Sequence, residues 1–203
     1  MVWIGKNASL YRAWLVTNRE KKGNCNYMTT PEQLDNFSRR VPDGDNMVRD
    51  VCDTCGFIGY QNPKMVVGSV VTAEDGRFLL CRRAIEPRAG FWTIPAGYLE
   101  LNETPEDGAK REAMEEACAA IEIDRVLAIY AITRLSQIQI IYRATLARPE
   151  FAAGPESTEV DLFAWDEIPW DEVAFPSVHW SLGQYRETAG RSDFAPFTNP
   201  TPA

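Results

Sequence analysis

Residues 110–120 (KREAMEEACAA) carry three carboxylates, Glu112, Glu115 and Glu116, within a run of good helix formers. Residues three and four apart share a helix face, so these like charges repel one another. Mg²⁺ takes oxygen ligands and shares them with substrate phosphates and water. A cation held by these carboxylates would remove the repulsion. The spacing therefore predicts a site for a hard cation such as Mg²⁺ on one helix face.

The helix that would present these carboxylates has a well-marked beginning. Thr104 is suited to be the N-cap, Pro105 suits the first helical position, and Asp107 completes a pattern close to a capping box. Glu106 and Asp107 complement the positive end of the helix dipole. We therefore predict a helix from about Pro105 to Ala117, in which alanines at every fourth position form a narrow stripe for close packing.

Strand patterns lie on both sides of this helix. The predicted strands are 65–73, 78–83, 121–132, 137–146 and 160–165. The turn signal EDGR (74–77) joins the first two strands into a hairpin, and 84–97 is broken by glycine and proline into a loop. A second helix is predicted at 177–189 and a loose tail at 191–203. This order predicts an α/β fold, a sandwich with helices on the faces of a mixed sheet.

The composition limits the function classes. With 203 residues, of which 45% are hydrophobic, the chain can form one sizeable core and a small appendage. Its net charge of -8 and pI near 4.8 argue against a general nucleic-acid-binding or membrane-binding protein. A phosphate-bearing substrate would need a metal ion or a local basic patch.

Cysteine usage favours a reducing compartment. The chain has five cysteines, an odd number, and only Cys52 and Cys55 have motif spacing. No stretch resembles the apolar core of a signal peptide or a membrane span. We expect a soluble cytoplasmic protein without a disulfide framework. The basic residues 1–24 are expected to be a frayed extension, with a targeting peptide as the alternative.

Residues 97–119 (GYLELNETPEDGAKREAMEEACA) resemble the signature of the Nudix hydrolases, G-x5-E-x7-R-E-U-x-E-E-x-G-U, where U is aliphatic. The resemblance implies an α/β/α sandwich that hydrolyses a nucleoside diphosphate linked to another moiety, using Mg²⁺ or Mn²⁺. It makes Glu112, Glu115 and Glu116 metal ligands. These enzymes are commonly dimers, and we expect a homodimer.

The resemblance also assigns the neighbouring positions. Arg111 would orient Glu103 or Glu112 through a charge-assisted hydrogen bond, and Gly97 would let the backbone turn close to the metal. One position departs from the family, because Cys118 stands where the signature has glycine. A cysteine in the left-handed conformation of a helix end costs about 1 kcal/mol. A structural substitution is the favoured interpretation, with a reactive thiol as the alternative.

Residues 39–68 resemble one Nudix subgroup, in which a small zinc ribbon precedes the catalytic domain. Plant plastid FAD and ADP-ribose pyrophosphatases and their bacterial relatives belong to it. Cys52 and Cys55 match the second cysteine pair, whereas the first pair is missing near Thr30 and Gln33. Structural zinc needs four ligands, so we expect a degenerate β segment without metal. Zinc held with the help of Cys25 is the alternative.

The predicted domain organisation has four parts: an N-terminal extension (1–28), the zinc-ribbon-like segment (29–62), the Nudix domain (63–190) and a C-terminal tail (191–203). The resemblance favours FAD or ADP-ribose as substrate, with release of AMP. Ser136 and Gln137 match only the start of the motif typical of NADH pyrophosphatases. NADH or a modified nucleoside triphosphate as substrate, and a non-catalytic nucleotide sensor, remain the alternatives.

The candidate substrate-binding residues fall into three groups. The aromatic rings that could stack on adenine or flavin are Tyr60, Phe91, Trp92 and Tyr98. The arginines that could meet phosphates are Arg82, Arg83 and Arg88. Core packing for the rings and solvation for the arginines are the other interpretations. In the later loop Glu156 and Glu159 are both candidates for the general base, beside the signature glutamates, with a surface role for each as the alternative. We place Glu159 with the catalytic residues and Glu156 with the substrate-binding residues.

Overall fold

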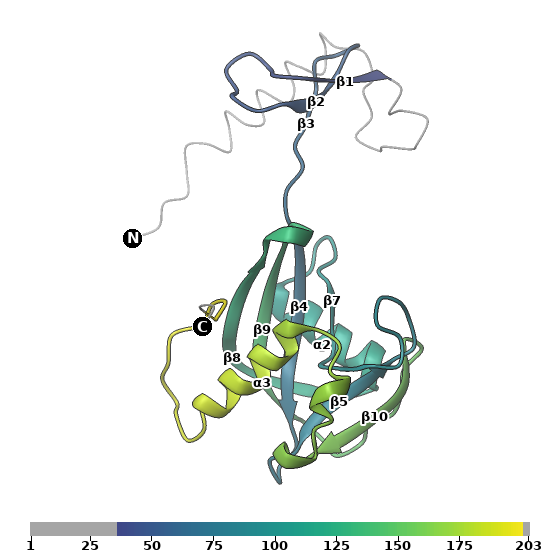
Figure 1. Ribbon diagram of the computed structural model, residues 1–203, viewed down its shortest axis with the longest axis vertical. Helices are drawn as coiled ribbons and strands as arrows, with labels where there is room; N and C mark the ends of the chain where they lie inside the picture. The colour runs from purple at the N-terminus through teal and green to yellow at the C-terminus, as the bar shows by residue number, and fades with distance from the viewer. Residues whose placement is uncertain (1–35, 201–203) are drawn as a thin grey trace. The chain divides into compact units, whose positions relative to one another are not determined.

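The structure is a computed structural model, and it describes residues 36–200 (Figure 1). The chain divides into two compact units, with the boundary between Asn62 and Pro63. The first unit is a small antiparallel sheet of β1 (Phe37–Arg40), β2 (Arg49–Cys52) and β3 (Ile58–Gly59), in that order. The N-terminal extension (1–28) and the positions Cys25, Thr30 and Gln33 lie outside the described residues.

The second unit is built on one mixed sheet. Its strands are β4 (Lys64–Thr72), β5 (Phe78–Arg83), β6 (Trp92–Thr93), β7 (Ala96–Tyr98), β8 (Ile121–Ile132), β9 (Gln137–Leu146) and β10 (Ser157–Phe163). The main path runs β10-β5-β4-β9-β8, while β6 pairs with β5 and β7 with β4. The β4–β9 pair is parallel and the others are antiparallel. The predicted mixed sheet is confirmed.

Two helices cover opposite faces of this sheet, α2 (Pro105–Ala117) and α3 (Pro176–Glu187) (Figure 1). Successive side chains of a strand point to opposite faces. On β4, Val70 accordingly packs in one core cluster with Leu182 of α3, and Val71 packs in another with Ala113 of α2. Short 3₁₀ turns lie at Thr133–Leu135, Trp165–Glu167 and Trp170–Glu172. The predicted sandwich is therefore present.

Helix α2 has the bounds that its capping residues predict. The Thr104 hydroxyl accepts a hydrogen bond from the Asp107 amide at 3.1 Å, and Pro105 occupies the first turn. The alanine stripe is fully buried, which allows close packing on the sheet. At the other end Cys118 has φ 47° and ψ 28°, the left-handed conformation in which a glycine would be unstrained.

The prediction of a loose tail is wrong for most of its length. The amide of Phe197 donates to Leu127 O and its carbonyl accepts from the Ile129 amide, both at 2.9 Å. The Asn199 side chain accepts from the Ala131 amide and donates to the Ala131 carbonyl. Strand β8 is the last strand of the sheet path, so its backbone groups are available for this pairing. The three prolines obscured this signal in the sequence.

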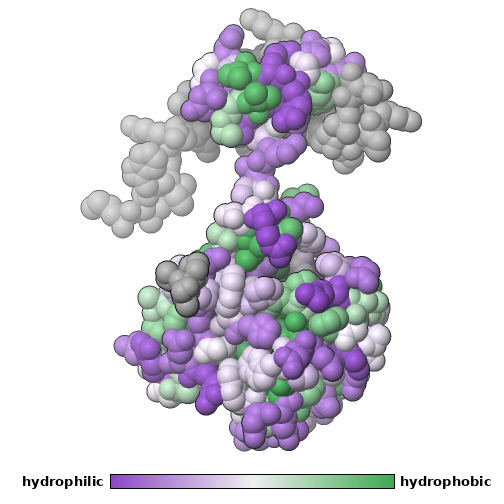
Figure 2. Space-filling view, viewed as in Figure 1, coloured by the Kyte–Doolittle hydropathy of each residue, from purple (hydrophilic) through white to green (hydrophobic). Residues whose placement is uncertain are grey.

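The surface carries apolar side chains mainly as scattered residues. In the first unit Val41, Met47 and Val48 are each about half exposed, and Figure 2 shows hydrophobic residues on the surface of that unit. Across the second unit, Figure 2 shows apolar residues interspersed with polar ones. Among the described residues, no helix has the length and apolarity needed to cross a bilayer.

Candidate active site

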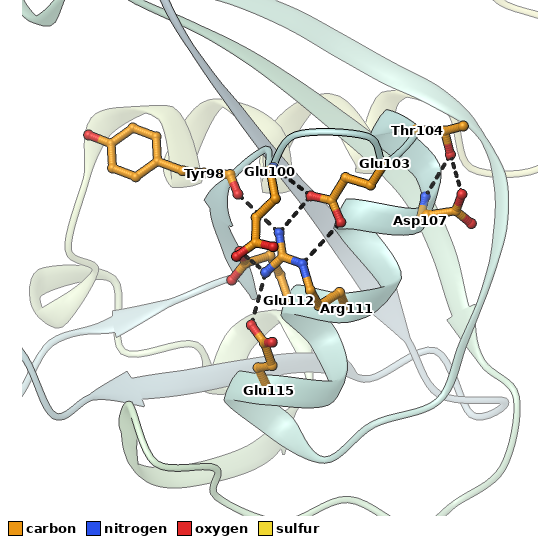
Figure 3. Close-up of polar contacts among 8 residues, drawn as sticks. All are labelled: Tyr98, Glu100, Glu103, Thr104, Asp107, Arg111, Glu112 and Glu115. Carbon is orange, nitrogen blue, oxygen red and sulfur yellow. Dashed lines mark hydrogen bonds and ion pairs between the residues drawn. The ribbon is translucent and has the colours of Figure 1, made fainter. Parts of the chain in front are cut away.

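Arg111 lies at the centre of a polar network that joins α2 to the loop before it (Figure 3). Its guanidinium donates two hydrogen bonds to Glu103, from Nε to Oε2 at 3.1 Å and from Nη2 to Oε1 at 2.8 Å. Nη2 also donates to the carbonyl of Tyr98 at 3.0 Å. The guanidinium holds the pKa of Glu103 below its ordinary value. Arg111 thus fixes the loop against the helix.

The same guanidinium contacts two of the predicted metal ligands. Nη1 donates to Glu112 Oε1 at 2.7 Å and to Glu115 Oε2 at 2.9 Å. The hydrogen bond to Glu103 and those to the helix carboxylates raise the pKa of Arg111, which keeps it charged. The sequence predicted that Arg111 orients Glu103 or Glu112. In the structure it contacts both, and Glu115 as well.

Strand β7 places backbone directly against the two buried carboxylates. Glu112 and Glu116 are only 8% and 5% exposed. The Ala96 amide donates to Glu116 Oε2 at 3.0 Å. A Cβ atom on Gly97 would stand 2.5 Å from the carboxyl carbon of Glu112, so only glycine allows this approach. The role of the signature glycine is thus to let the backbone lie against a carboxylate.

Burial changes the acidity of both carboxyl groups. Loss of solvation raises the pKa of Glu116 to about 7, and the negative charges of Glu112 and Glu156 act in the same direction. Burial also raises the pKa of Glu112, although Arg111 opposes this rise. Desolvated carboxylates on one helix face form an all-oxygen donor set that fits Mg²⁺ or Mn²⁺. Within residues 36–200 no three acidic, histidine or cysteine side chains are already grouped around a metal position, because Arg111 holds Glu112 and Glu115.

The structure separates the two glutamates of the later segment, since Glu156 lies in the loop before β10 and Glu159 lies within β10. The charge of Glu156 raises the pKa of both Glu112 and Glu116. Glu159 lies opposite Arg82 in the β10–β5 pairing and forms an ion pair with it, at 3.4 Å. Of the two general-base candidates, Glu159 is thus engaged with Arg82, which favours Glu156.

Alternation along β5 separates two of the three arginine candidates, Arg82 and Arg83. Leu80 belongs to the core cluster beneath α3 and Cys81 to the cluster beneath α2, so Arg82 and Arg83 begin on opposite faces. Arg82 also forms an ion pair with Glu172, which holds its guanidinium away from the carboxylates of α2. The charge of Arg83 instead acts on Glu116 and lowers its pKa. The Arg83 Nε donates to Pro87 O at 2.9 Å and its guanidinium lies over the Phe175 ring, so of the two arginines Arg83 is the one without a carboxylate partner among the described ion pairs.

The aromatic candidates differ in exposure. Trp92 is 5% exposed and packs edge-on against Phe163 in the core, so it is unavailable as a stacking surface. Tyr98 is 51% exposed, and its hydroxyl accepts from Gln137 at 3.0 Å. Phe91 stacks beneath Arg88 in the loop before β6, whereas Tyr60 belongs to the first unit. Tyr98 is therefore the exposed ring among these candidates of the second unit; its carbonyl contacts Arg111, while the Lys64 ammonium lies over its ring.

The remaining cysteine pair lies in the first unit. Cys52 ends β2 and is buried, and Cys55 follows in the turn and is half-buried. The Cys52 amide donates to Phe57 O and the Cys52 carbonyl accepts from the Gly56 amide, both at 2.8 Å. Backbone hydrogen bonds thus close this turn.

Two backbone contacts at the candidate site were not predicted from the sequence. The first is the Ala96 amide, which acts on Glu116 through the backbone and so leaves no residue-type signal. The second is Gly154, whose backbone lies against the end of α2. Its isolated position in a loop gives no pattern that would connect it to the carboxylates.

Comparison with known proteins identifies the family. The NUDIX domain family matches residues 62–181, more than half of the chain. The chain belongs to the Nudix hydrolases. A second family, described as Nudix N-terminal and zinc-ribbon-like, matches residues 35–61. The small sheet before the Nudix domain is therefore the counterpart of the zinc ribbon of that subgroup, with only one of its cysteine pairs.

Individual relatives agree with this assignment. The crystal structure of a Nudix hydrolase from Nitrosomonas europaea is 43% identical, with a TM-score of 0.74 over 80% of this chain and 93% of that one. A MutT-like protein of Streptomyces ambofaciens is 37% identical over 50% of this chain. An ADP-ribose pyrophosphatase of Methanocaldococcus jannaschii is 26% identical over 54% of it. The matches span 64% and 67% of the lengths of these two relatives.

Proposed function

We propose that this Nudix hydrolase cleaves the diphosphate bond of ADP-ribose or FAD in a reaction that needs Mg²⁺ or Mn²⁺ and releases AMP. The observation that carries the proposal is the pair of buried carboxylates, Glu112 and Glu116, on the signature helix. The similarity to an archaeal ADP-ribose pyrophosphatase supports the substrate class. The resemblance of the N-terminal segment to that of FAD and ADP-ribose pyrophosphatases supports it independently.

Each residue of the site has a proposed role. Glu112, Glu115 and Glu116 would hold the metal, which supplies charge neutralisation at the phosphoryl oxygens and a more acidic bound water. Arg111 keeps Glu112 and Glu115 in place. Glu156 is proposed to accept the proton of the attacking water, whose oxygen bonds to phosphorus as the P–O–P bond breaks.

Substrate contacts follow from charge and exposure. Arg83 starts on the α2 side of β5 and its charge acts on Glu116, so it is the arginine proposed to meet phosphate oxygens. Tyr98 presents an exposed ring on the residue whose carbonyl contacts Arg111, and it is proposed to stack on adenine or flavin. Each ring face accepts any planar base, so Tyr98 alone does not choose between the two substrates.

A substrate panel tests the proposal. Purified protein is incubated with Mg²⁺ or Mn²⁺ and ADP-ribose, FAD, NADH or a modified nucleoside triphosphate, and AMP and the partner product are quantified. We expect the highest kcat/KM with ADP-ribose or FAD, and loss of activity by orders of magnitude in the Glu116→Gln variant. A folded protein that binds these nucleotides without turnover would be a sensor and would refute the proposed reaction. Preference for NADH or a triphosphate would refute the proposed substrate.

A further inference from the structure

The loop before β10 is hydrogen-bonded to the last turn of α2. The Ala152 amide donates to the carbonyl of Ala117 at 2.9 Å, and the Gly154 amide donates to the carbonyl of Glu116 at 3.0 Å. The final carbonyls of a helix have no partner within the helix. The loop supplies those partners, and one of the carbonyls belongs to a carboxylate residue of the site.

Gly154 lies too close to α2 for any side chain. A Cβ atom there would stand 2.8 Å from the carbonyl carbon of Glu115, and closer still to its oxygen. It would also lie 3.2 Å from the carbonyl carbon of Glu116. Gly154 is not among the glycines with positive φ, so close approach and not backbone conformation requires glycine here. Both obstructing groups are backbone and cannot rotate away.

The same loop fixes Glu156 from its other side. The Ser157 amide donates to Gly154 O at 3.1 Å, and the Ala84 amide donates to Glu156 O at 2.8 Å. Ser157 begins β10 and pairs with Arg83 of β5. Glu156 is therefore held between α2, through Gly154, and the end of β5. Glu156 stands two residues after Gly154, whose amide is bonded to the Glu116 carbonyl, so the loop brings Glu156 to the end of the helix that carries the carboxylates.

We propose that Gly154 is a positioning residue, whose missing side chain lets the loop seat on the last turn of α2 and so holds Glu156 beside the divalent-cation site. This rests on the proposed function only for the location of the cation. The effect of Gly154 on cation binding does not depend on which substrate is cleaved.

The test is Mn²⁺ binding by the full-length protein without substrate, followed by the paramagnetic signal of the free ion. We expect Gly154→Ala to weaken Mn²⁺ binding on the order of tenfold, the scale on which removing supporting groups affects metal sites. The matched control is Gly183→Ala in α3, because a Cβ at Gly183 meets nothing within 4 Å. That variant should bind Mn²⁺ like the parent protein.

A double-mutant cycle separates positioning from general damage. If Gly154 acts through Glu156, then Glu156→Gln weakens Mn²⁺ binding, and adding Gly154→Ala to it causes no further loss. Should Gly154→Ala fail to fold, Ala152→Pro detaches the loop by removing the amide that bonds to Ala117, and the same cycle is run with it. Circular dichroism establishes that each variant used is folded.

The outcomes distinguish this inference from the proposed function. Parent-like Mn²⁺ binding by folded Gly154→Ala, or additive losses in the double variant, would overturn the role of Gly154. If the parent protein cleaves no nucleotide but the binding cycle is non-additive, the proposed reaction fails while the positioning role stands. Loss of binding with Gly183→Ala as well would show a general effect of core substitution and would also overturn the inference.

Discussion

Replacing Glu116 with glutamine is expected to stabilise the metal-free protein at alkaline pH. The pKa of Glu116 is about 7 in the fold, against 4.5 without the fold, chiefly because the carboxylate is buried. A tenfold change in acidity is worth about 1.4 kcal/mol, so the ionised form costs about 3 kcal/mol of folding free energy. Glutamine is neutral and nearly isosteric, and its carbonyl can still accept the Ala96 amide.

The pH window follows from the direction of the shift. Below pH 4.5 the carboxyl is protonated in both the folded and the unfolded chain, and the two proteins should be equally stable. As the pH rises toward 7, the unfolded chain loses this proton before the folded chain does, so the parent protein loses stability. Above pH 7 the difference in folding free energy between the parent and Glu116→Gln proteins is complete. It corresponds to a Tm roughly 5–10 °C higher for Glu116→Gln.

Thermal melts in EDTA and in Mg²⁺ measure this difference. We expect the parent Tm to rise with Mg²⁺ concentration above pH 7, since the cation binds the folded state only, and the Glu116→Gln Tm to respond weakly. The matched control is Glu122→Gln on β8. Glu122 is exposed, so this substitution removes a carboxylate that is solvated and not a buried one. Equal melting of parent and Glu116→Gln proteins in EDTA at pH 8 would refute the reasoning that burial makes Glu116 a site for a cation.

Three further substitutions test the surroundings of the site. Gly97→Ala should lower kcat on the order of a hundredfold with little change in fold, because its Cβ displaces the Glu112 carboxylate; wild-type turnover would contradict the close approach. Arg111→Lys should lower the free energy of unfolding on the order of 2 kcal/mol, since lysine cannot bridge Glu103 and the helix carboxylates together. An unchanged denaturation midpoint would contradict this. Cys118→Gly should raise stability by about 1 kcal/mol at unchanged activity, because φ is 47° there; a lower Tm would count against backbone strain.

The signature helix was predictable because its information is local. Thr104, Pro105 and Asp107 define where the helix begins, and alanine spacing defines which face is buried, so the predicted bounds agree with α2. The strands 121–132 and 137–146 were likewise marked by runs of β-branched residues, and β8 and β9 have those bounds. In both cases, residue types within a short window carry the preference.

The parts that the sequence could not supply depend on distant contacts. The Arg82 and Arg83 pair looked equivalent until strand alternation and the β10 register assigned Arg82 to Glu159 and Arg83 to the carboxylate side. Trp92 was open to an interpretation as a stacking ring because exposure is a tertiary property. The docked C-terminal segment escaped for the same reason, since its partner β8 lies some way back along the chain.

The charge distribution explains why the need for a cation centres on Glu116. Arg111 compensates Glu103, Glu112 and Glu115 by direct hydrogen bonds. Among the described residues Glu116 has no ion pair, and its hydrogen-bond donor is the neutral Ala96 amide. A divalent ion bound to Glu116 would add positive charge where Arg111 does not reach, and Glu112 and Glu115 would join it by exchanging their hydrogen bonds with Arg111. Removing the charge of Glu116 should therefore abolish most metal-linked stabilisation, whereas removing that of Glu115, which is exposed and paired with Arg111, should only weaken it.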